Sequence, residues 1–244
     1  MALLRDATTV MWKDLKVSLR ANRGIGGVLY LAFWALLFGA GLPLLMGETW
    51  LTSPEVLFVW AWLPLYVVTP MLGGAFAGER ELHTLETLLA TPLSNQAILW
   101  GKIAAGAAYG WAYALASIVL GPFVIALATG SPLRLYRPPV AVGGPVVGLM
   151  GAVAGASLGV LISLRAGTNR EAQDGISLAL MAFTIPIAAV RAGLQALDVP
   201  VADVLLAING WLLDLVLIAA LGVVSFVAVR IARARFVRTR LLLD

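Results

Sequence analysis

The sequence predicts an all-α integral membrane protein, in which residues 1–244 form a single transmembrane domain of six membrane-spanning helices. Hydrophobic residues make up 61% of the chain and charged residues only 12%, and the mean hydropathy is +0.93. A soluble domain carries about twice that share of charge. One soluble core has no use for so much apolar surface, so the apolar stretches must face lipid. Cysteine is absent, which excludes disulfides, thiol catalysis and cysteine metal sites.

Residues 1–24 predict an amphipathic interfacial helix that lies on the membrane before the first span. Trp12 suits the headgroup region. Apolar side chains share one face of this helix and basic side chains occupy the others. The apolar residues are Leu4, Ala7, Met11, Leu15 and Leu19, and the basic residues are Arg5, Lys13, Lys16 and Arg20.

Six apolar stretches predict the membrane spans, each long enough or nearly long enough to cross the hydrocarbon. They are residues 25–46, 56–77, 103–129, 140–164, 176–190 and 210–229. Pro64 and Pro70 predict a kink in the second span, and Gly121-Pro122 predicts a break near the outer end of the third. The fourth span has small residues every four positions, so another backbone can approach it closely. We expect packing within the chain there, with contact between two subunits as the alternative.

The apolar stretch from 176 to 229 is too long for one span and has two interpretations. In the first, a full fifth span runs to Leu197 and buries Arg191 in the bilayer, with Asp214 as its partner. In the second, which we favour, the fifth span ends near 190 and residues 191–209 form a re-entrant hairpin in the outer leaflet. Arg191 and Asp214 then form a charge pair near the outer interface.

Basic residues predict the orientation. With both termini in the cytoplasm, fourteen of the seventeen lysine and arginine residues lie on the inner side, as the positive-inside rule requires. Residues 230–244 form a basic cytoplasmic tail, which we interpret first as an anchor and second as a patch for anionic lipid. Nucleic-acid binding is not favoured, because the positive charges lie beside the hydrophobic spans. We expect the chain in the plasma membrane of a prokaryote.

Residues 78–102 form the longest polar passage between two apolar runs, and they predict a cytoplasmic coupling loop. Leu82, Leu85, Leu89 and Leu93 fall on one stripe of a helix. We expect Leu82, Leu85 and Leu89 to bury against the bundle. Pro92 ends that helix and Ser94 is placed as the N-cap of the next. An amphipathic helix at the membrane face suits docking to a partner outside the bilayer.

This loop resembles the cytoplasmic loop of ABC-2 type permeases, of the sodium- and drug-exporter-like branch. The resemblance rests on Glu79-Arg80-Glu81, Thr84-Leu85-Glu86, Leu88-Leu89-Ala90-Thr91-Pro92 and Gly101-Lys102. A second stretch, RAGTNREAQD from 165 to 174, resembles the passage before the fifth span of such permeases. The chain departs from the pattern at His83, where the family usually has glycine. On this resemblance the residues that dock an ATPase are Glu79, Arg80, Glu81, His83, Thr84, Leu85, Glu86, Leu88, Leu89, Pro92, Arg170 and Glu171.

The resemblance implies the ABC-2 (type V exporter-like) architecture and a permease subunit that is not itself an enzyme. Separate cytoplasmic ABC ATPase subunits would bind ATP and Mg and push the coupling helix, moving substrate outward. A second permease copy, identical or related, and membrane lipids are the other implied partners, and no cofactor is expected in this chain. A haem-exporter-type permease is a lesser alternative.

Other chemistries are less favoured by the residues. The chain has no Gly-x-x-x-x-Gly-Lys-Ser/Thr loop and a single histidine, so neither a phosphate loop nor a histidine-rich zinc site is expected. Glu79, Glu81 and Glu86 are better explained as docking contacts than as metal ligands. The main functional alternative is a secondary transporter or channel that needs no ATPase, with an intramembrane enzyme ranked last. The substrate stays open.

Overall fold

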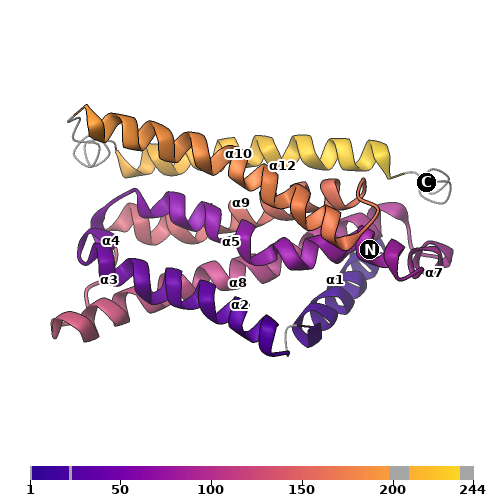
Figure 1. Ribbon diagram of the computed structural model, residues 1–244, viewed down its shortest axis with the longest axis horizontal. Coiled ribbons are helices and arrows are strands. Elements are labelled where there is room, and N and C mark those ends of the chain that lie inside the picture. The colour runs from indigo at the N-terminus through magenta and orange to yellow at the C-terminus, as the bar shows by residue number, and fades with distance from the viewer. Residues whose placement is uncertain (1, 22–23, 198–208, 237–244) are drawn as a thin grey trace.

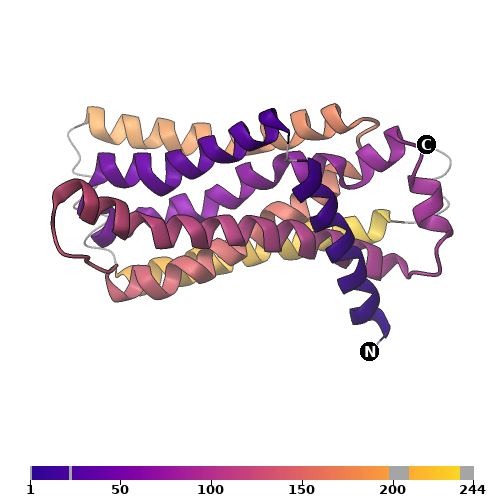
Figure 2. The same ribbon diagram turned by 90° about the horizontal axis from the view of Figure 1, so that it is seen from below.

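The computed structural model describes residues 2–21, 24–197 and 209–236, and the elements there are helices joined by turns. Long helices lie side by side in one bundle, and α1 crosses it obliquely near one end (Figures 1 and 2). The helices are α1 (Ala2–Ala21), α2 (Ile25–Leu36), α3 (Leu42–Met46), α4 (Thr49–Thr52), α5 (Val56–Gly73), α6 (Glu79–Glu81), α7 (Leu85–Ala90), α8 (Asn95–Thr129), α9 (Pro138–Ser163), α10 (Asn169–Ala196) and α12 (Gly210–Arg235), with π-helical segments η1 (Leu37–Gly41) and η2 (Gly74–Gly78).

Five helical stretches within the described residues are long and apolar enough to cross a membrane. They are Ile25–Met46, Val56–Glu81, Asn95–Thr129, Pro138–Ser163 and Gly210–Arg235, and they contain the predicted first, second, third and sixth spans and nearly all of the fourth. The predicted fifth span lies in α10, which is not among the five. The count of six spans therefore stays a prediction.

The helix α10 extends further than the predicted fifth span. It runs unbroken to Ala196, six residues past the predicted end at 190, so residues 191–196 continue the helix instead of opening a hairpin. That stretch contains no proline and only one glycine, and nothing in it stops a helix. The rest of the predicted hairpin, residues 198–208, lies outside the described residues.

The predicted break at Gly121-Pro122 is wrong, because α8 continues through it to Thr129. Proline removes the N–H that would bond the carbonyl of Ile118. The Tyr136 hydroxyl donates to that carbonyl instead, at 3.0 Å, and itself accepts from Trp50 Nε1 at 3.2 Å. Burial raises the pKa of Tyr136, so its hydroxyl stays protonated and able to donate. Hydrogen bonding from a neighbouring segment lets a membrane helix keep a proline.

The same compensation occurs at Pro70 of α5. Its missing N–H leaves the carbonyl of Tyr66 free, and the Tyr30 hydroxyl of α2 donates to it. Trp34 of α2 stacks on the Tyr66 ring, with centroids 5.0 Å apart. α5 remains one helix across both of its prolines and then widens into η2.

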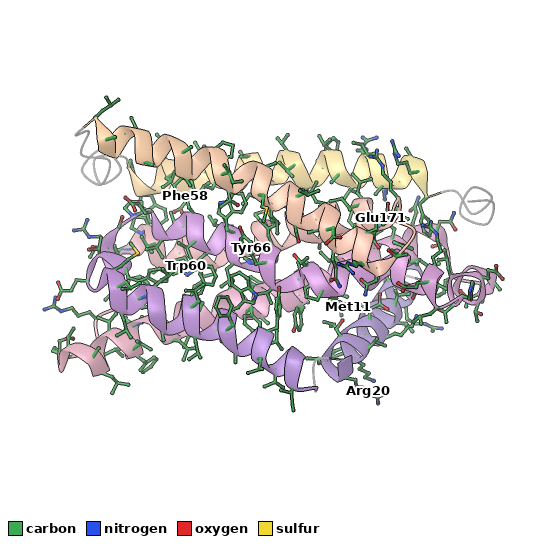
Figure 3. The ribbon with its side chains drawn as sticks, viewed as in Figure 1. Met11, Arg20, Phe58, Trp60, Tyr66 and Glu171 are labelled. Atoms are coloured by element: carbon green, nitrogen blue, oxygen red, sulfur yellow. The ribbon has the colours of Figure 1, made fainter. Side chains whose placement is uncertain are left out.

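Glycines of α9 let other helices of the same chain approach closely, as predicted. A Cβ at Gly144 would overlap the Trp60 ring, and one at Gly151 would overlap the backbone of Ala61. A Cβ at Gly159 would lie 2.5 Å from Leu72 Cδ1. α9 therefore sits at the centre of the bundle against α5, α8 and α12, with Trp60 directed into the interior (Figure 3).

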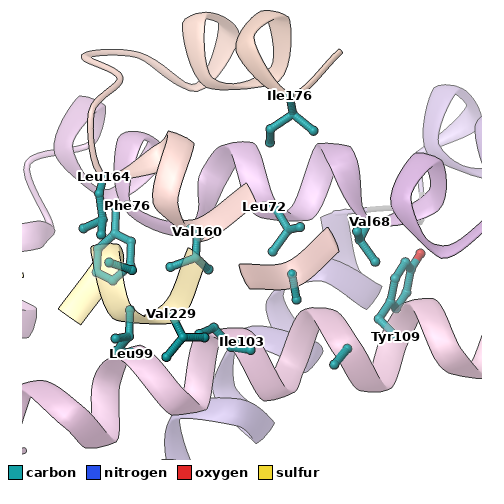
Figure 4. Packing of buried hydrophobic residues seen from close by; sticks show 14 of the residues in the cluster. Val68, Leu72, Phe76, Leu99, Ile103, Tyr109, Val160, Leu164, Ile176 and Val229 are labelled. Carbon is teal, nitrogen blue, oxygen red and sulfur yellow. The ribbon is translucent and has the colours of Figure 1, made fainter. Parts of the chain in front are cut away.

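A core of aliphatic and aromatic side chains fills the half of the bundle that lies towards α7. Phe76, Leu72, Ile103 and Val160 are each at most 3% exposed there, and they meet from three different helices and η2 (Figure 4). This packing fixes the position from which residues 78–94 leave the bundle. We call this end of the molecule the α7 end.

Candidate coupling site at the α7 end

Residues 79–90 form two short helices, and the single helix predicted from the leucine spacing is wrong. α6 ends at Glu81 and α7 begins at Leu85. Leu82, which the stripe predicted to be buried, is 73% exposed, whereas Leu85 and Leu88 are 4% and 8% exposed. The side chain of Leu89 lies outside the described residues.

His83 explains the break. Its φ is +54°, which makes it the one residue other than glycine with positive φ in the described part of the chain. Thr84 N donates to Glu79 O at 2.8 Å and His83 N to Arg80 O at 3.0 Å. These two bonds form a Schellman motif, in which the residue at the position of His83 is usually glycine. Histidine thus adopts the left-handed turn that the family's usual glycine favours.

Glu79 lies in a cluster of four charged side chains that joins α1, α6 and α8. Lys102 is 3% exposed, and its Nζ lies 3.2 Å from Glu79 Oε1 and 3.2 Å from Asp14 Oδ2. Lys13 Nζ lies 3.1 Å from the same Glu79 oxygen. The Lys102 ammonium also sits 5.0 Å from the centre of the Phe76 ring. Because a buried cation needs such partners, Glu79 contributes to the internal structure of this end.

Arg80 and Glu81 contact the connection between α9 and α10. The Arg80 guanidinium donates to the carbonyls of Leu164, at 3.4 Å, and of Ala166. Glu81 Oε2 accepts from Asn169 N at 3.0 Å. A cation at the carboxyl end of α9 and an anion at the amino end of α10 both match the helix dipoles.

Ser163 holds η2 against the end of α9. It is fully buried, and its Oγ accepts from Phe76 N and Ala77 N at 3.0 Å each and donates to Gly73 O at 3.1 Å. A π-helical segment leaves backbone groups without their usual α-helical partners, and one hydroxyl satisfies three of them. The chain thereby enters α6 from a fixed position.

The α9–α10 connection is itself ordered by short-range bonds. Thr168 Oγ1 accepts from Glu171 N at 3.2 Å, and Glu171 Oε2 accepts from Gly167 N at 2.8 Å. These reciprocal bonds form a capping arrangement at the start of α10. Arg170 is exposed beside them. Figure 3 shows Glu171 at this end of the bundle.

The residues predicted to dock an ATPase therefore divide into two groups. Glu79, Arg80 and Glu81 bond to neighbouring elements of the same chain, and Leu85 and Leu88 are buried. The second group is exposed on the surface. It comprises His83, Thr84, Glu86, Pro92, Arg170 and Glu171.

Comparison with known proteins decides the family. A family model described as ABC-2 family transporter protein matches residues 8–227. The chain belongs to the ABC-2 transporter family. It is thus a multi-pass integral membrane protein with an all-α fold and the permease component of an ABC transporter, and permeases of this family generally work with an ABC ATPase. No curated protein matches the chain.

The predicted outer charge pair of this ABC-2 permease is described only at Asp214. Its side chain is 4% exposed, and neither carboxylate oxygen has a hydrogen-bond partner among the described residues. A Cβ at Gly143 of α9 would overlap that carboxylate, so the two helices meet closely there. The side chain of Arg191 lies outside the described residues, and the pair stays a prediction.

Sequence reasoning missed three residues of the coupling site. Asp14 was placed only within an amphipathic helix, Lys102 only within a motif, and Ser163 within an apolar span. The available signal was that Lys102 and Ser163 interrupt otherwise apolar stretches. A polar group in such a place requires a bonding partner. The partner's identity depends on helix packing and is not readable from local sequence.

Proposed function

We propose that this ABC-2 permease is the membrane-spanning subunit of an ATP-driven exporter, in which a separate cytoplasmic ATPase acts on the surface formed by residues 82–92. The ATPase would bind ATP and Mg, and a second permease copy would complete the transmembrane pathway. In this proposal both termini lie in the cytoplasm of a prokaryote and substrate moves outward through the plasma membrane.

The observation that carries the proposal is an exposed segment whose preceding residues, Glu79, Arg80 and Glu81, bond to several helices. Leu82 is 73% exposed, and His83, Thr84 and Glu86 beside it are also exposed. An apolar side chain surrounded by polar ones matches the composition of a protein contact, which has an apolar centre and a polar rim. This supports docking at the tip of the segment, while the three residues before it hold the segment in place.

The bonds of those three residues support transmission of force from the tip. Glu79 is joined to α1 and α8, Arg80 to the end of α9, and Glu81 to the start of α10. A displacement of the tip would therefore act on four helices, α1, α8, α9 and α10, which a loose loop would not do. Coupling between distant sites needs such a rigid connection between elements.

The test is copurification of a tagged chain from its native host in mild detergent. We expect an ABC ATPase in roughly equal amount, and we expect the exposed substitution Glu86→Arg to remove it while the chain stays folded by circular dichroism. Glu48→Arg is the matched control, since Glu48 is also an exposed carboxylate but lies at the opposite end, near Arg134. Leu85 is unsuitable as a docking variant because it is buried. Retention of the ATPase by Glu86→Arg contradicts the assigned surface.

A second candidate, a carrier that needs no ATPase, is favoured by one observation. Asp214 is a buried carboxylate without a hydrogen-bond partner among the described residues, and ionisable groups inside a membrane often mark ion pathways. The copurification separates the two: absence of an ATPase under several detergents, with the chain intact and monodisperse, favours the carrier. Substrate transport that survives deletion of every ATPase gene of the host would do the same.

A further inference from the structure

A polar cavity lies at the α7 end, between the start of α8 and the end of α12. Its volume is about 220 Å³, and Asn95, Gln96, Leu99, Arg233 and Phe236 line it. Asn95 Nδ2 donates to the carbonyl of Phe236 at 3.5 Å across it, so the two helices are joined on one side of the cavity. The cavity therefore presents amide groups and one guanidinium within a space large enough for a small polar group.

The cations near this cavity have no salt-bridge partner among the described residues. At the same end of the molecule, Lys13 and Lys102 are paired with carboxylates. By contrast, no salt bridge within the described residues involves Arg230, Arg233 or Arg235 of α12. A cluster of unpaired cations favours a bound anion.

Two of these guanidinium groups are held in place by aromatic rings. Arg233 lies over Trp100 of α8, 5.1 Å from the ring centre, and Arg230 lies over Phe226, 4.9 Å from its ring centre. Stacking on a ring restrains a guanidinium and leaves its N–H edge available for hydrogen bonds. Such a fork matches the oxygen atoms of a phosphate.

The surface next to the cavity is apolar and faces away from the bundle. Val223, Phe226, Val227 and Ile231 of α12 are 63%, 60%, 47% and 38% exposed. α12 is one of the stretches able to cross the membrane, and in a bilayer an outward-facing apolar surface on such a helix is available to acyl chains. An anion site at the end of a lipid-facing helix surface fits a ligand that carries both a phosphate and hydrocarbon chains.

We propose that the cavity between α8 and α12 binds the headgroup phosphate of an anionic phospholipid, whose chains lie along α12. Basic pockets between transmembrane helices bind such headgroups. A phospholipid with net negative charge is favoured over a zwitterionic one, because the ammonium of the latter offsets the attraction of its phosphate for the Arg233 guanidinium. This site is independent of the ATPase contact proposed above.

The site is positioned to stabilise the arrangement of the α7 end. Its wall at Phe236 touches η2, since the Phe236 and Phe76 rings lie 5.2 Å apart. Its opposite wall is the first turn of α8, which directly follows the exposed segment. A bound headgroup therefore bridges α12 and α8 where residues 78–94 rejoin the bundle.

Native mass spectrometry of the purified full-length chain tests the proposal. The chain is freed of host lipid, supplemented with phosphatidylglycerol or phosphatidylcholine of the same chain length, and the bound lipid is counted. We expect one retained phosphatidylglycerol, with at least tenfold weaker retention of phosphatidylcholine. Arg233→Gln should lower the affinity for phosphatidylglycerol about tenfold, because a charge-assisted bond is lost.

Two variants and one competitor make the test specific. Arg235→Gln is the matched control, since Arg235 is exposed and does not line the cavity, and it should change the affinity less than twofold. Gln96 is an exposed residue that lines the cavity, and Gln96→Leu should weaken binding severalfold. This second variant keeps the proposal testable if Arg233→Gln does not fold. Equal losses for Arg233→Gln and Arg235→Gln would show diffuse attraction and overturn the proposal. Displacement of the lipid by millimolar inorganic phosphate would overturn it also, because the ligand would then be a soluble anion.

Discussion

The substitution Ser163→Ala tests whether one hydroxyl holds the π-helical segment at the start of the coupling site. Ser163 Oγ makes three hydrogen bonds, with Phe76 N, Ala77 N and Gly73 O. Alanine fits the same space on α9 but has no hydroxyl. The two N–H groups and the carbonyl therefore lose their bond to residue 163. Since the site is fully buried, water does not replace the hydroxyl without a local opening.

The expected loss follows from the number of bonds. Interhelical hydrogen bonds in membrane proteins contribute about 0.6 kcal/mol on average, and up to about 1.7 kcal/mol. Leaving a buried backbone group unpaired costs about 1–3 kcal/mol. Three groups are affected, and partial return of η2 to α-helical bonding recovers some of the cost. We expect Ser163→Ala to lower the free energy of unfolding by roughly 2–4 kcal/mol.

Ser157→Ala is the matched control for this measurement. Ser157 is also fully buried on α9, but its Oγ donates only to the carbonyl of Val153 in the same helix, at 2.7 Å. That carbonyl keeps its own backbone partner, so the expected change is below about 1 kcal/mol. Unfolding of the purified chain by increasing fractions of SDS in mixed micelles, followed by circular dichroism, gives both values. Equal losses for the two serines would refute the assigned role of Ser163.

Three further predictions concern stability and use the same assay. His83→Gly should raise the free energy of unfolding by roughly 0.5–1 kcal/mol, because glycine adopts positive φ without steric cost; no gain would contradict the strained turn. Gly143→Ala should lower it by about 1–3 kcal/mol through overlap with a neighbouring carboxylate, whereas Gly222→Ala, with open space around it, should not. Lys102→Met should cost about 1.5–3 kcal/mol, because the half-buried Asp14 and Glu79 carboxylates lose their charged partner inside the bundle. Lys13→Ala, at a side chain 52% exposed, should cost at most about 1 kcal/mol, and similar losses for both lysines would argue against a buried cluster.

The apolar stretches and local capping signals predicted much of the fold. Ser94 caps α8 as predicted, since its Oγ accepts from Ala97 N at 3.1 Å, and the glycines of α9 pack inside the chain. These features depend on length, composition or spacing of a few residues, which a sequence displays directly. The break expected at Pro122 is wrong because Tyr136, fourteen residues later in the chain, supplies the missing hydrogen bond. The local sequence around Pro122 does not show that contact.

The candidate site was predicted in position but not in detail. The leucine spacing suggested one helix, yet the backbone turns at His83, and nothing in the local pattern marks a histidine as taking the conformation typical of glycine. The motif suggested that all its charges face a partner protein. Which charges turn inward is decided by helix ends that lie about 85 residues later in the chain, at Leu164 and Asn169, and such contacts are set by tertiary packing.

The three residues Glu79, Arg80 and Glu81 show why consecutive charges suit a junction between helices. Successive residues of a helix point about 100° apart, so three neighbours in one short helix face three different elements. Each charge has the sign that its direction requires: Glu79 meets lysines, Arg80 meets carbonyls at the end of α9, and Glu81 meets an amide at the start of α10. Exchanging Arg80 with Glu81 would place each charge against the end of a helix dipole of the same sign. The polar motif Glu79-Arg80-Glu81 is thus explained by internal structure before any partner is considered. The proposed docking surface begins only at the turn that follows it.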